Sequence, residues 1–309
     1  MRKLRIATRA SELALAQARL VGDAIATAAY GAAAEGVSIE LVVLETAGDR
    51  QLDRPIGAIG GQGVFVKEVE RALLDGRADL AVHSAKDLPS ANGTDGLDIV
   101  AVPKRADPRD ALVGLALSEL GPGAHIATGA PRRRAQLAWL RPDLRFVELR
   151  GNIATRLKKV PDHGAVVVAF AALERLGLSQ LAADVLAIST MMPQVGQGAL
   201  AVQCRQGDET TAELLYLIDD ADSHRCLDAE RAFLAALGGG CELPVGAHAE
   251  LGADGALELS GLVASLDGLI VLRRCLRGQD GRQLGRALAS EILENCGGAV
   301  ILSGTSELR

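Results

Sequence analysis

The order in which short apolar strands, turns and helices recur along the chain constrains the fold most. An apolar strand at residues 4–8 leads through a turn into an alanine-rich helix at residues 12–29, and Ser11 can cap that helix. Buried strands recur at residues 125–127 and 165–169, each followed by a helix. Strands that alternate with helices are typical of α/β sheets, which bind ligands beyond the ends of their strands. This part of the chain therefore predicts α/β domains.

The pattern changes toward the C-terminus. A helix at residues 223–237 precedes three strands, near residues 245–250, 257–264 and 270–277. A last helix is expected near residues 283–295. Three successive strands flanked by helices indicate a small α+β domain.

Length and composition bound the class of protein. The chain has 309 residues, and 49% of them are hydrophobic. A single hydrophobic core rarely grows beyond roughly 250–300 residues, so we expect two or three domains. The sequence contains no N-terminal apolar run and no stretch of about 18 uninterrupted apolar residues. A net charge of −6 argues against nucleic acid as a partner. We therefore expect a cytoplasmic protein without a nucleic-acid or membrane partner.

One of the five cysteines has an unusual setting. The five are scattered, without paired or histidine-linked spacing, which argues against a disulfide framework or a metal site. Cys241 lies on the glycine-rich, proline-closed stretch at residues 237–244, where three glycines relax the backbone constraints. Such a turn can present a nucleophile or an anchor, and a flexible connector is the alternative.

The basic residues are mainly arginines, since six of the 33 are lysines. A GC-rich genome can account for most of them, but arginines beside glycines or helix starts suit carboxylate or phosphate recognition. Residues 132–134 are three arginines directly after Pro131, a residue typical of helix starts. Cations there oppose the helix dipole unless an anion lies nearby, and the helix end also offers free N–H groups to an anion.

Three further features could belong to a site. Lys86 and Asp87 place a cation beside a carboxylate where the strand at residues 78–82 ends, with a solvated ion pair as the alternative. His83 is more typical of a structural histidine than of a metal ligand. The glycine-rich segment 47–63 lacks the ending of a phosphate loop, so it predicts either a lid over a site or an ordinary surface loop.

Six separated motifs follow one another along the chain: Arg5-Ile6-Ala7-Thr8-Arg9 with Ser11, Ala81-Val82-His83-Ser84 with Lys86-Asp87, Asp107-Pro108-Arg109-Asp110, Arg150-Gly151-Asn152 with Thr155-Arg156-Leu157, Val195-Gly196-Gln197-Gly198-Ala199, and Gly239-Gly240-Cys241 with Pro244. In this order, from residue 5 to beyond residue 250, they resemble the hydroxymethylbilane synthase family, also called porphobilinogen deaminases. Several motifs in register are far more specific than any one of them.

The resemblance implies a transferase of tetrapyrrole and haem biosynthesis. The family joins four porphobilinogen units head to tail with release of ammonia, then hydrolyses off the linear tetrapyrrole, hydroxymethylbilane. The chain grows on a dipyrromethane cofactor that a cysteine holds through a thioether, and Cys241 occupies that position here. A thiolate is a soft nucleophile suited to capturing the electrophile that deamination generates. The implied partner is the small molecule porphobilinogen, and we expect a monomer.

The resemblance also implies residue roles, because every pyrrole carries carboxylates that accumulate in one site. Two such charges about 4 Å apart repel by roughly 4 kcal/mol at an effective dielectric near 20, and arginine forks can offset this repulsion. Asp87 matches the catalytic aspartate, which can protonate or steer the leaving amine and stabilise the cation that forms. Cofactor and substrate binding falls by motif position to Arg9, Ser11, Lys86, Thr128, Arg132, Arg133, Arg150, Arg156, Arg175 and Gln197.

The implied fold has two doubly wound α/β domains like periplasmic binding proteins around a cleft, plus a small α+β C-terminal domain that carries the cofactor cysteine. We place domain 1 at residues 1–102 and 194–219, domain 2 at residues 103–193 and domain 3 at residues 220–309. Hinged domain pairs of this kind close around ligands.

The sequence departs from the family pattern at two places. The lid segment commonly carries lysines where this chain has Ala58 and Gln62. The usual Gly-Thr-Ser-Ser-Leu-Arg-Arg segment becomes residues 127–133 here, with Gly129 and Ala130 in place of two hydroxyls. We expect cofactor assembly to persist and turnover or product retention to change, with Arg134 as a partial compensation.

Two alternatives to the polymerising transferase stay open. The cleft fold also serves solute receptors and effector domains, so the chain could be a binding protein for acidic pyrroles. It could also be a divergent paralogue that binds such pyrroles with little or no chain growth.

Overall fold

The structure is a computed structural model that describes residues 2–31, 36–44, 66–90, 93–239 and 243–306. Its elements group into two compact units, Met1–Ala106 with Ala199–His224, and Asp107–Gly198 with Arg225–Arg309. We call these unit 1 and unit 2. Among the helices that the structure describes, none combines the length and apolar composition that crossing a bilayer requires.

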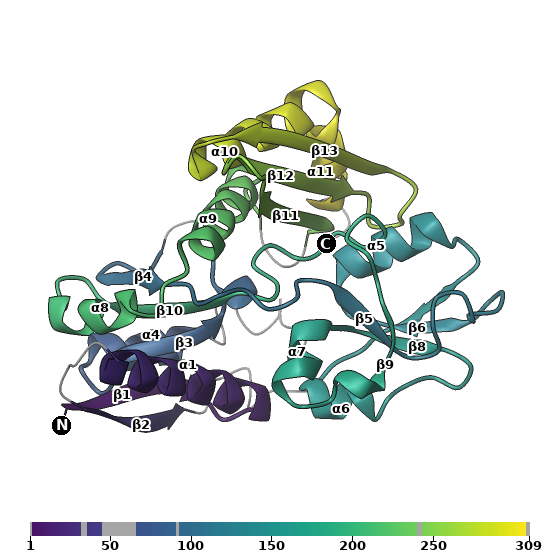
Figure 1. The fold of residues 1–309 in the computed structure, drawn as a ribbon. Coiled ribbons are helices and arrows are strands. Elements are labelled where there is room, and N and C mark those ends of the chain that lie inside the picture. The colour runs from purple at the N-terminus through teal and green to yellow at the C-terminus, as the bar shows by residue number, and fades with distance from the viewer. Residues whose placement is uncertain (1, 32–35, 45–65, 91–92, 240–242, 307–309) are drawn as a thin grey trace. The chain divides into compact units, whose positions relative to one another are not determined.

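Unit 1 contains a five-stranded sheet in the order β2-β1-β3-β10-β4 (Figure 1). Its strands are β1 (Arg2–Arg9), β2 (Val37–Leu44), β3 (Leu80–Ser84), β4 (Leu97–Ala101) and β10 (Leu200–Arg205). The first three are parallel, and β10 runs antiparallel between β3 and β4. The chain therefore leaves this sheet after β4 and returns to its interior at β10.

Helices cover both faces of this sheet. Helices α1 (Glu12–Gly31) and α8 (Glu209–Tyr216) pack on one face, over a core that includes Ile6, Val21 and Leu215. Helix α4 (Lys67–Leu74) packs on the other face through Val69 and Leu73. Ser11 caps α1 as expected, because its Oγ accepts a hydrogen bond from the Ala14 N–H at 3.3 Å.

Unit 2 contains a second five-stranded sheet with the same sequence of strand directions, in the order β7-β6-β8-β5-β9. Its strands are β5 (Asp110–Gly114), β6 (His125–Ala127), β7 (Arg145–Val147), β8 (Ala165–Ala169) and β9 (Ala182–Val185). Helix α5 (Pro131–Leu140) packs on one face through Leu137, and helices α6 (Ile153–Leu157) and α7 (Phe170–Arg175) pack on the other. Both large sheets are thus covered by helices on both faces.

The third sheet, also in unit 2, is an antiparallel meander of β11 (Val245–Leu251), β12 (Leu257–Ala264) and β13 (Val271–Gly278). Helices α9 (Ala221–Ala236) and α10 (Gly281–Ser290) cover one face around the fully buried Phe233. The two helices approach closely at Gly285, where a Cβ atom would lie 2.4 Å from the carbonyl oxygen of Ala229. On the other face, Leu262 and Ala264 pack against Ala135 of α5 and Met192, so this small sheet is joined to the second one.

The predicted α/β class with a small C-terminal α+β part is confirmed, while several elements differ. Strands β6, β8 and β12 lie where we expected them, but β4, β5 and β9 were missed. Each missed strand carries an aspartate, inside the strand in β4 and β9 and at the first position in β5, so no apolar run as long as the strand marks it. The predicted boundaries of three domains stay a prediction.

The helix expected near residues 283–295 is present, but it is not the last one and its end is not α-helical. Helix α10 ends at Ser290 and passes into a π-helical turn, η3 (Glu291–Asn295). Gly297 then adopts φ 79°, and a further helix, α11 (Gly298–Ser306), follows. The left-handed backbone that glycine permits ends the first helix and allows the chain to begin another.

Candidate functional site

In unit 1, the predicted site residues gather at the carboxyl edge of the parallel strands. Arg9 is the last residue of β1, and Ser11 lies in the turn that follows. Lys86 and Asp87 form the short 3₁₀ turn η1 (Ala85–Asp87) directly after β3. Because β1 and β3 are neighbours and parallel, both turns leave the sheet at the same edge. Open α/β sheets bind their ligands beyond this edge.

The η1 turn is anchored so that its two charged side chains lie toward the surface. The Ala85 N–H donates to the carbonyl oxygen of Ala199 at 3.0 Å, and the Ser84 hydroxyl pairs with the buried amide of Gln17 at 2.9 Å. Asp87 is exposed and Lys86 is half-buried. An exposed carboxylate on an anchored turn can reach a bound ligand, as the catalytic assignment requires.

His83 precedes this turn and is a buried residue of β3, consistent with a structural histidine. Burial lowers the pKa of its imidazole to about 4, the side chain of Gln203 opposes this effect, and the positive charge of Arg9 adds to it. His83 is therefore neutral near pH 7.

In unit 2, predicted residues again follow parallel strands. Thr128 comes directly after β6, Arg150 follows β7, and Arg175 ends α7, the helix that continues from β8. The same edge of the second sheet thus carries the residues that sequence motifs assigned to carboxylate binding. Thr128 is buried, and its hydroxyl accepts a hydrogen bond from the Ala130 N–H at 3.2 Å.

Three predicted residues meet at one carboxylate, that of Asp110, the first residue of β5. Arg132 Nη1 lies 2.8 Å from Asp110 Oδ2. Arg133 donates to Asp110 Oδ1 from Nε at 3.0 Å and from Nη2 at 2.8 Å, and Gln197 Nε2 donates to the same oxygen at 3.0 Å. The anion that the sequence led us to expect at the start of α5 is therefore an internal one. The binding of ligand carboxylates by these arginines stays a prediction.

The electrostatics of this cluster are dominated by burial and by the charges themselves. Asp110 has no exposed surface, and Arg132 and Arg133 are about 95% buried. Burial alone would raise the pKa of Asp110, but the two guanidinium groups outweigh it and hold that pKa well below its ordinary value. Burial lowers the pKa of Arg132, against the attraction of Asp110. Asp110 is therefore ionised at neutral pH.

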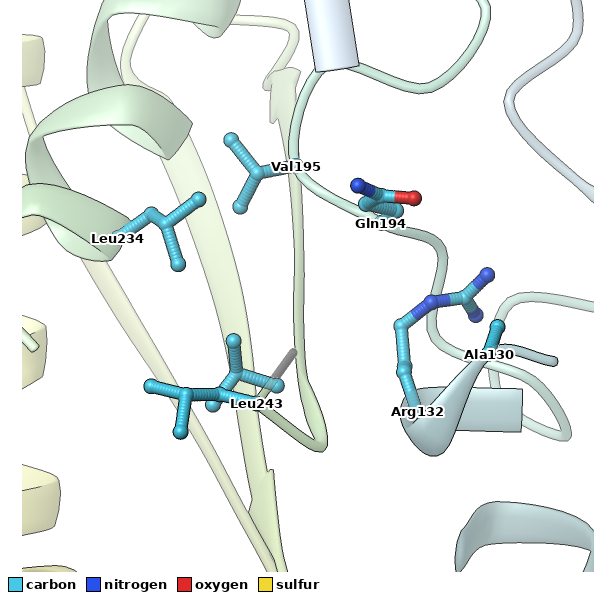
Figure 2. A pocket seen from close by; sticks show the side chains of 7 residues that line it. Ala130, Arg132, Gln194, Val195, Leu234 and Leu243 are labelled. Atoms are coloured by element: carbon cyan, nitrogen blue, oxygen red, sulfur yellow. The ribbon is translucent and has the colours of Figure 1, made fainter. Parts of the chain in front are cut away.

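The two arginines have different surroundings. Arg133 Nη1 donates to the carbonyl oxygen of Val167 at 2.9 Å, so Nε and both Nη atoms are engaged by Asp110 and that carbonyl. Arg132 Nη1 donates to the carbonyl oxygen of Met192 at 2.5 Å, and its side chain lines a pocket (Figure 2). Of the pair, Arg132 is the one that a ligand in this pocket would meet.

The pocket itself combines a cation with apolar walls. Figure 2 shows the Arg132 side chain rising from the start of α5 beside Gln194, with Val195, Leu234 and Leu243 across from it. The remaining lining residues are Ala130 and Val245. The lining combines aliphatic groups with a guanidinium, the two kinds of surface that a ring with carboxylate substituents requires.

Arg175 is a second, half-buried cation. Its Nη2 donates to the carbonyl oxygen of Gly198 at 2.6 Å, next to Gln197. Burial lowers the pKa of this guanidinium to about 10, opposed by the nearby carboxylate of Glu174. A guanidinium at a poorly hydrated position gains more from a ligand carboxylate than one in water does.

Arg150 and Arg156 lie around the turn between β7 and α6. Arg150 Nη2 is 3.5 Å from Glu148 Oε1 in a pair with exposed side chains, which contributes little stability. Arg156 Nε donates to the carbonyl oxygen of Gly151 at 2.8 Å, where the backbone has φ 111°. Asn152 caps α6 by accepting a hydrogen bond from the Thr155 N–H at 2.9 Å. The turn is ordered by contacts of its own.

One departure from the family pattern has a structural reason. A Cβ atom at Gly129 would lie 2.8 Å from the carbonyl oxygen of Leu149 and 2.9 Å from Glu148 Oε1, so a serine there requires its neighbours to move. The Arg134 guanidinium lies over the Phe146 ring, 5.7 Å from the centroid, and the compensation expected of it stays a prediction. Cys241, Ala58, Gln62 and the segment 47–63 lie outside the described residues.

Sequence reasoning missed Asp110 as the organiser of the site. It appears in the sequence as an acidic residue that opens the apolar run Ala111, Leu112 and Val113. An aspartate at the start of a buried strand, together with adjacent arginines at a helix start, is the signal that could have identified the pairing.

Comparison with known proteins gives one consistent result. Residues 4–213 match the family model described as "Porphobilinogen deaminase, dipyromethane cofactor binding domain", and residues 224–294 match "Porphobilinogen deaminase, C-terminal domain". The chain is similar to the porphobilinogen deaminase of Roseiflexus castenholzii, with 46% identity over 307 residues, 97% of this chain and 99% of that protein. It is similar to that of Nitratidesulfovibrio vulgaris, with 44% identity over 312 residues, 97% of this chain and 96% of that protein.

Among solved structures, the methionine binding protein MetQ is similar at 13% identity and a TM-score of 0.44, over 72% of this chain and 92% of that one. At this TM-score the likeness adds nothing to the matches above.

Replacing Asp110 with asparagine is expected to destabilise unit 2. Asp110→Asn leaves two buried guanidinium groups without their carboxylate, and breaking a buried pair in this way costs about 3–5 kcal/mol. Urea unfolding measures the loss. Asp143→Asn is the control, because Asp143 pairs with Arg141 at the surface, and its loss is expected to change stability little. Equal stability of the two variants would contradict the role of Asp110.

The depressed pKa of His83 predicts a pH dependence of stability. The folded pKa of about 4 lies below the ordinary value of 6.5, so the unfolded chain binds the proton first as pH falls. The free energy of unfolding should therefore decrease from pH 6.5 to pH 4 by up to about 1.4 kcal/mol per pH unit from this group. His83→Gln should flatten the slope in this window, while His163→Gln, at an exposed position, should keep it. Denaturant unfolding at several pH values checks both.

Proposed function

Because the chain belongs to the porphobilinogen deaminase family, we propose that it is an active hydroxymethylbilane synthase. This transferase joins four porphobilinogen molecules, releases one ammonia for each, and hydrolyses the linear tetrapyrrole from its dipyrromethane cofactor. The observation that carries the proposal is the pocket lined by Arg132 and by Leu243, two residues after Cys241, in a chain that matches its relatives along almost its full length. We place it, as a monomer, in cytoplasmic tetrapyrrole biosynthesis.

The residues of this chain fit the cofactor chemically. A dipyrromethane has two flat rings and several carboxylates, which call for apolar walls and guanidinium donors. The lining of the pocket includes both, and Arg175 adds a half-buried cation. We assign the thioether to Cys241 and cofactor binding to Arg132, with Arg133 acting beside it through Asp110. When bound, the cofactor would supply the pyrrole terminus to which the first substrate unit is joined, and each later unit would join the one before it.

Asp87 is assigned the proton chemistry. Its carboxyl group is exposed on the anchored turn after β3, where a bound substrate amine can approach it. As the amine leaves, Asp87 hands a proton to its nitrogen, and the resulting carboxylate stabilises the cationic carbon left behind. Lys86, beside it, attracts a substrate carboxylate and so orients the amine toward Asp87.

The remaining predicted residues are assigned to hold the carboxylates of substrate and product. Charge-assisted hydrogen bonds of this kind contribute about 1.5–3 kcal/mol each. Their placement at the carboxyl edges of two parallel sheet segments supports the assignment, because each edge can present several donors to one long ligand. In unit 1 these are Arg9 and Ser11, and in unit 2 Thr128, Arg150, Arg156, Arg175 and Gln197.

The test of the function is the intact mass of the purified protein before and after incubation with porphobilinogen. We expect a mass above that of the polypeptide by one dipyrromethane, then a ladder of successive pyrrole increments. A bare mass that stays unchanged after loading points to a binding protein. A fixed adduct without further increments points to a divergent paralogue with little or no chain growth. The departures from the family pattern at Ala58, Gln62, Gly129 and Ala130 are the reason to test for this outcome.

Two substitutions separate attachment from chemistry. Cys241→Ser should lose the covalent dipyrrole, because a hydroxyl at neutral pH is a far poorer nucleophile than a thiolate. Asp87→Asn should keep the dipyrrole and release ammonia at least 100-fold more slowly, since general acid catalysis contributes roughly 10²–10⁴-fold. Mass spectrometry measures the first effect and an ammonia assay the second. Normal turnover by the asparagine variant would remove Asp87 from its assigned role.

A further inference from the structure

Glu230 is a buried carboxylate that none of the site assignments uses. It lies in α9 with no exposed surface. Its Oε2 accepts a hydrogen bond from the Gly196 N–H at 2.7 Å, and its Oε1 accepts one from the Ala249 N–H at 2.9 Å. His248 Nδ1 is 3.8 Å from Oε1. One side chain thus joins helix α9, strand β11 and the glycine turn at residues 195–198.

A carboxylate at this position is costly unless it organises its surroundings. Removing an ionised group from water carries a large desolvation penalty, which two backbone N–H donors offset in part. Buried charged groups are often no more stabilising than apolar side chains of similar volume. Glu230 differs from such a side chain in that it fixes the positions of two backbone amides.

The first amide leads to the arginine pair. Gly196 adopts φ 72° and immediately precedes Gln197. Gln197 Nε2 donates to the carbonyl oxygen of Pro108 at 2.8 Å and to Asp110 Oδ1 at 3.0 Å. Asp110 in turn holds Arg132 and Arg133. A continuous line of hydrogen bonds and ion pairs therefore connects Glu230 to both guanidinium groups.

The second amide leads to the elements that flank Cys241 in the sequence. Helix α9 ends at Ala236, before the cysteine, and β11 begins at Val245, after it. Leu234 of α9, Val245 of β11 and Val195 beside the glycine turn all line the pocket that contains Arg132. All three segments that contribute these apolar residues make contact with Glu230 or carry it.

From these contacts we propose that Glu230 is a positioning residue, which aligns the carboxylate-binding arginines with the helix and strand on either side of the attachment cysteine. It acts through Gly196 and Gln197, without touching the ligand itself. The inference rests on the proposed function, because alignment matters only if a tethered polyacid is bound there.

The test compares Glu230→Gln with a matched control. Glutamine keeps the shape but places an NH₂ donor against either Gly196 N–H or Ala249 N–H, so one of the two bonds is lost. The control, Asp219→Asn, alters a carboxylate in unit 1 that also accepts from a backbone N–H, that of Val102 at 2.7 Å, and faces a histidine, His224, at 2.8 Å. Thermal unfolding measures how far each variant is destabilised, so that their kinetics can be compared at a temperature where both are folded.

Steady-state kinetics of the holoenzyme then separates positioning from general destabilisation. For Glu230→Gln we expect the KM for porphobilinogen to rise about tenfold, equivalent to about 1.4 kcal/mol, with kcat changed less than threefold. Asp219→Asn should keep both constants. A Glu230→Gln enzyme whose KM matches that of the control overturns the inference, while a wild-type protein that forms no pyrrole ladder overturns the proposed function instead.

A double-mutant cycle with Gln197→Ala tests the route. If Glu230 acts through the glycine turn, the double variant should have a KM within about twofold of the Gln197→Ala single variant. If the KM increases of the two single variants multiply in the double variant, Glu230 and Gln197 act independently, which would contradict the proposed connection through Gly196 and Gln197. Should Glu230→Gln not fold, hydrogen exchange on the wild-type protein decides, since the relay requires the Gly196 amide to be protected, and exchange at the rate of an open loop rejects it.

Discussion

The ion pair between Asp110 and two adjacent arginines is the interaction on which the candidate site depends. Two guanidinium groups side by side in a poorly hydrated interior repel each other strongly, and helix α5 begins with both of them at its positive end. The carboxylate of Asp110 removes this repulsion from within the protein. Because Asp110 opens β5 and also accepts from Gln197, the same contact joins a strand, a helix start and a glycine turn.

This arrangement limits what the arginine pair can offer a ligand. One carboxylate between two guanidinium groups leaves a single net positive charge, and Arg133 commits Nε and both Nη atoms to contacts within the protein. Arg132 alone of the pair lines the pocket. A ligand with many carboxylates would therefore need further cations besides Arg132. The wide spacing of arginines along the sequence is what such a ligand requires, since one compact cluster would need its own internal anions.

The sequence predicts many of the strands and helices well, but it does not predict which side chains pair with each other across the fold. The strands at residues 125–127, 165–169 and 257–264 were located because nothing polar interrupts their buried faces. The strand that begins at Asp110 was missed because its first residue is charged, and that charge is what organises the site. Arg132 and Arg133 were recognised as cations in need of an anion, but a local pattern does not reveal a partner 22 or 23 positions away. Long-range partners such as Glu230 and Gly196 are set by the packing of α9, which periodicity alone does not predict.

Gly129, which replaces a serine of the family pattern, is in close contact with the segment that carries Arg150. A Cβ atom at this position would press on Glu148 and on the carbonyl oxygen of Leu149, the two residues just before Arg150. Glu148 is also the residue whose carboxylate lies 3.5 Å from the Arg150 guanidinium. A serine at position 129 would therefore displace the segment that carries Arg150. In this chain the loss of a hydroxyl and the placement of that arginine are two consequences of one close backbone approach, so a serine at position 129 would change the contacts of Arg150 as well as add a hydroxyl.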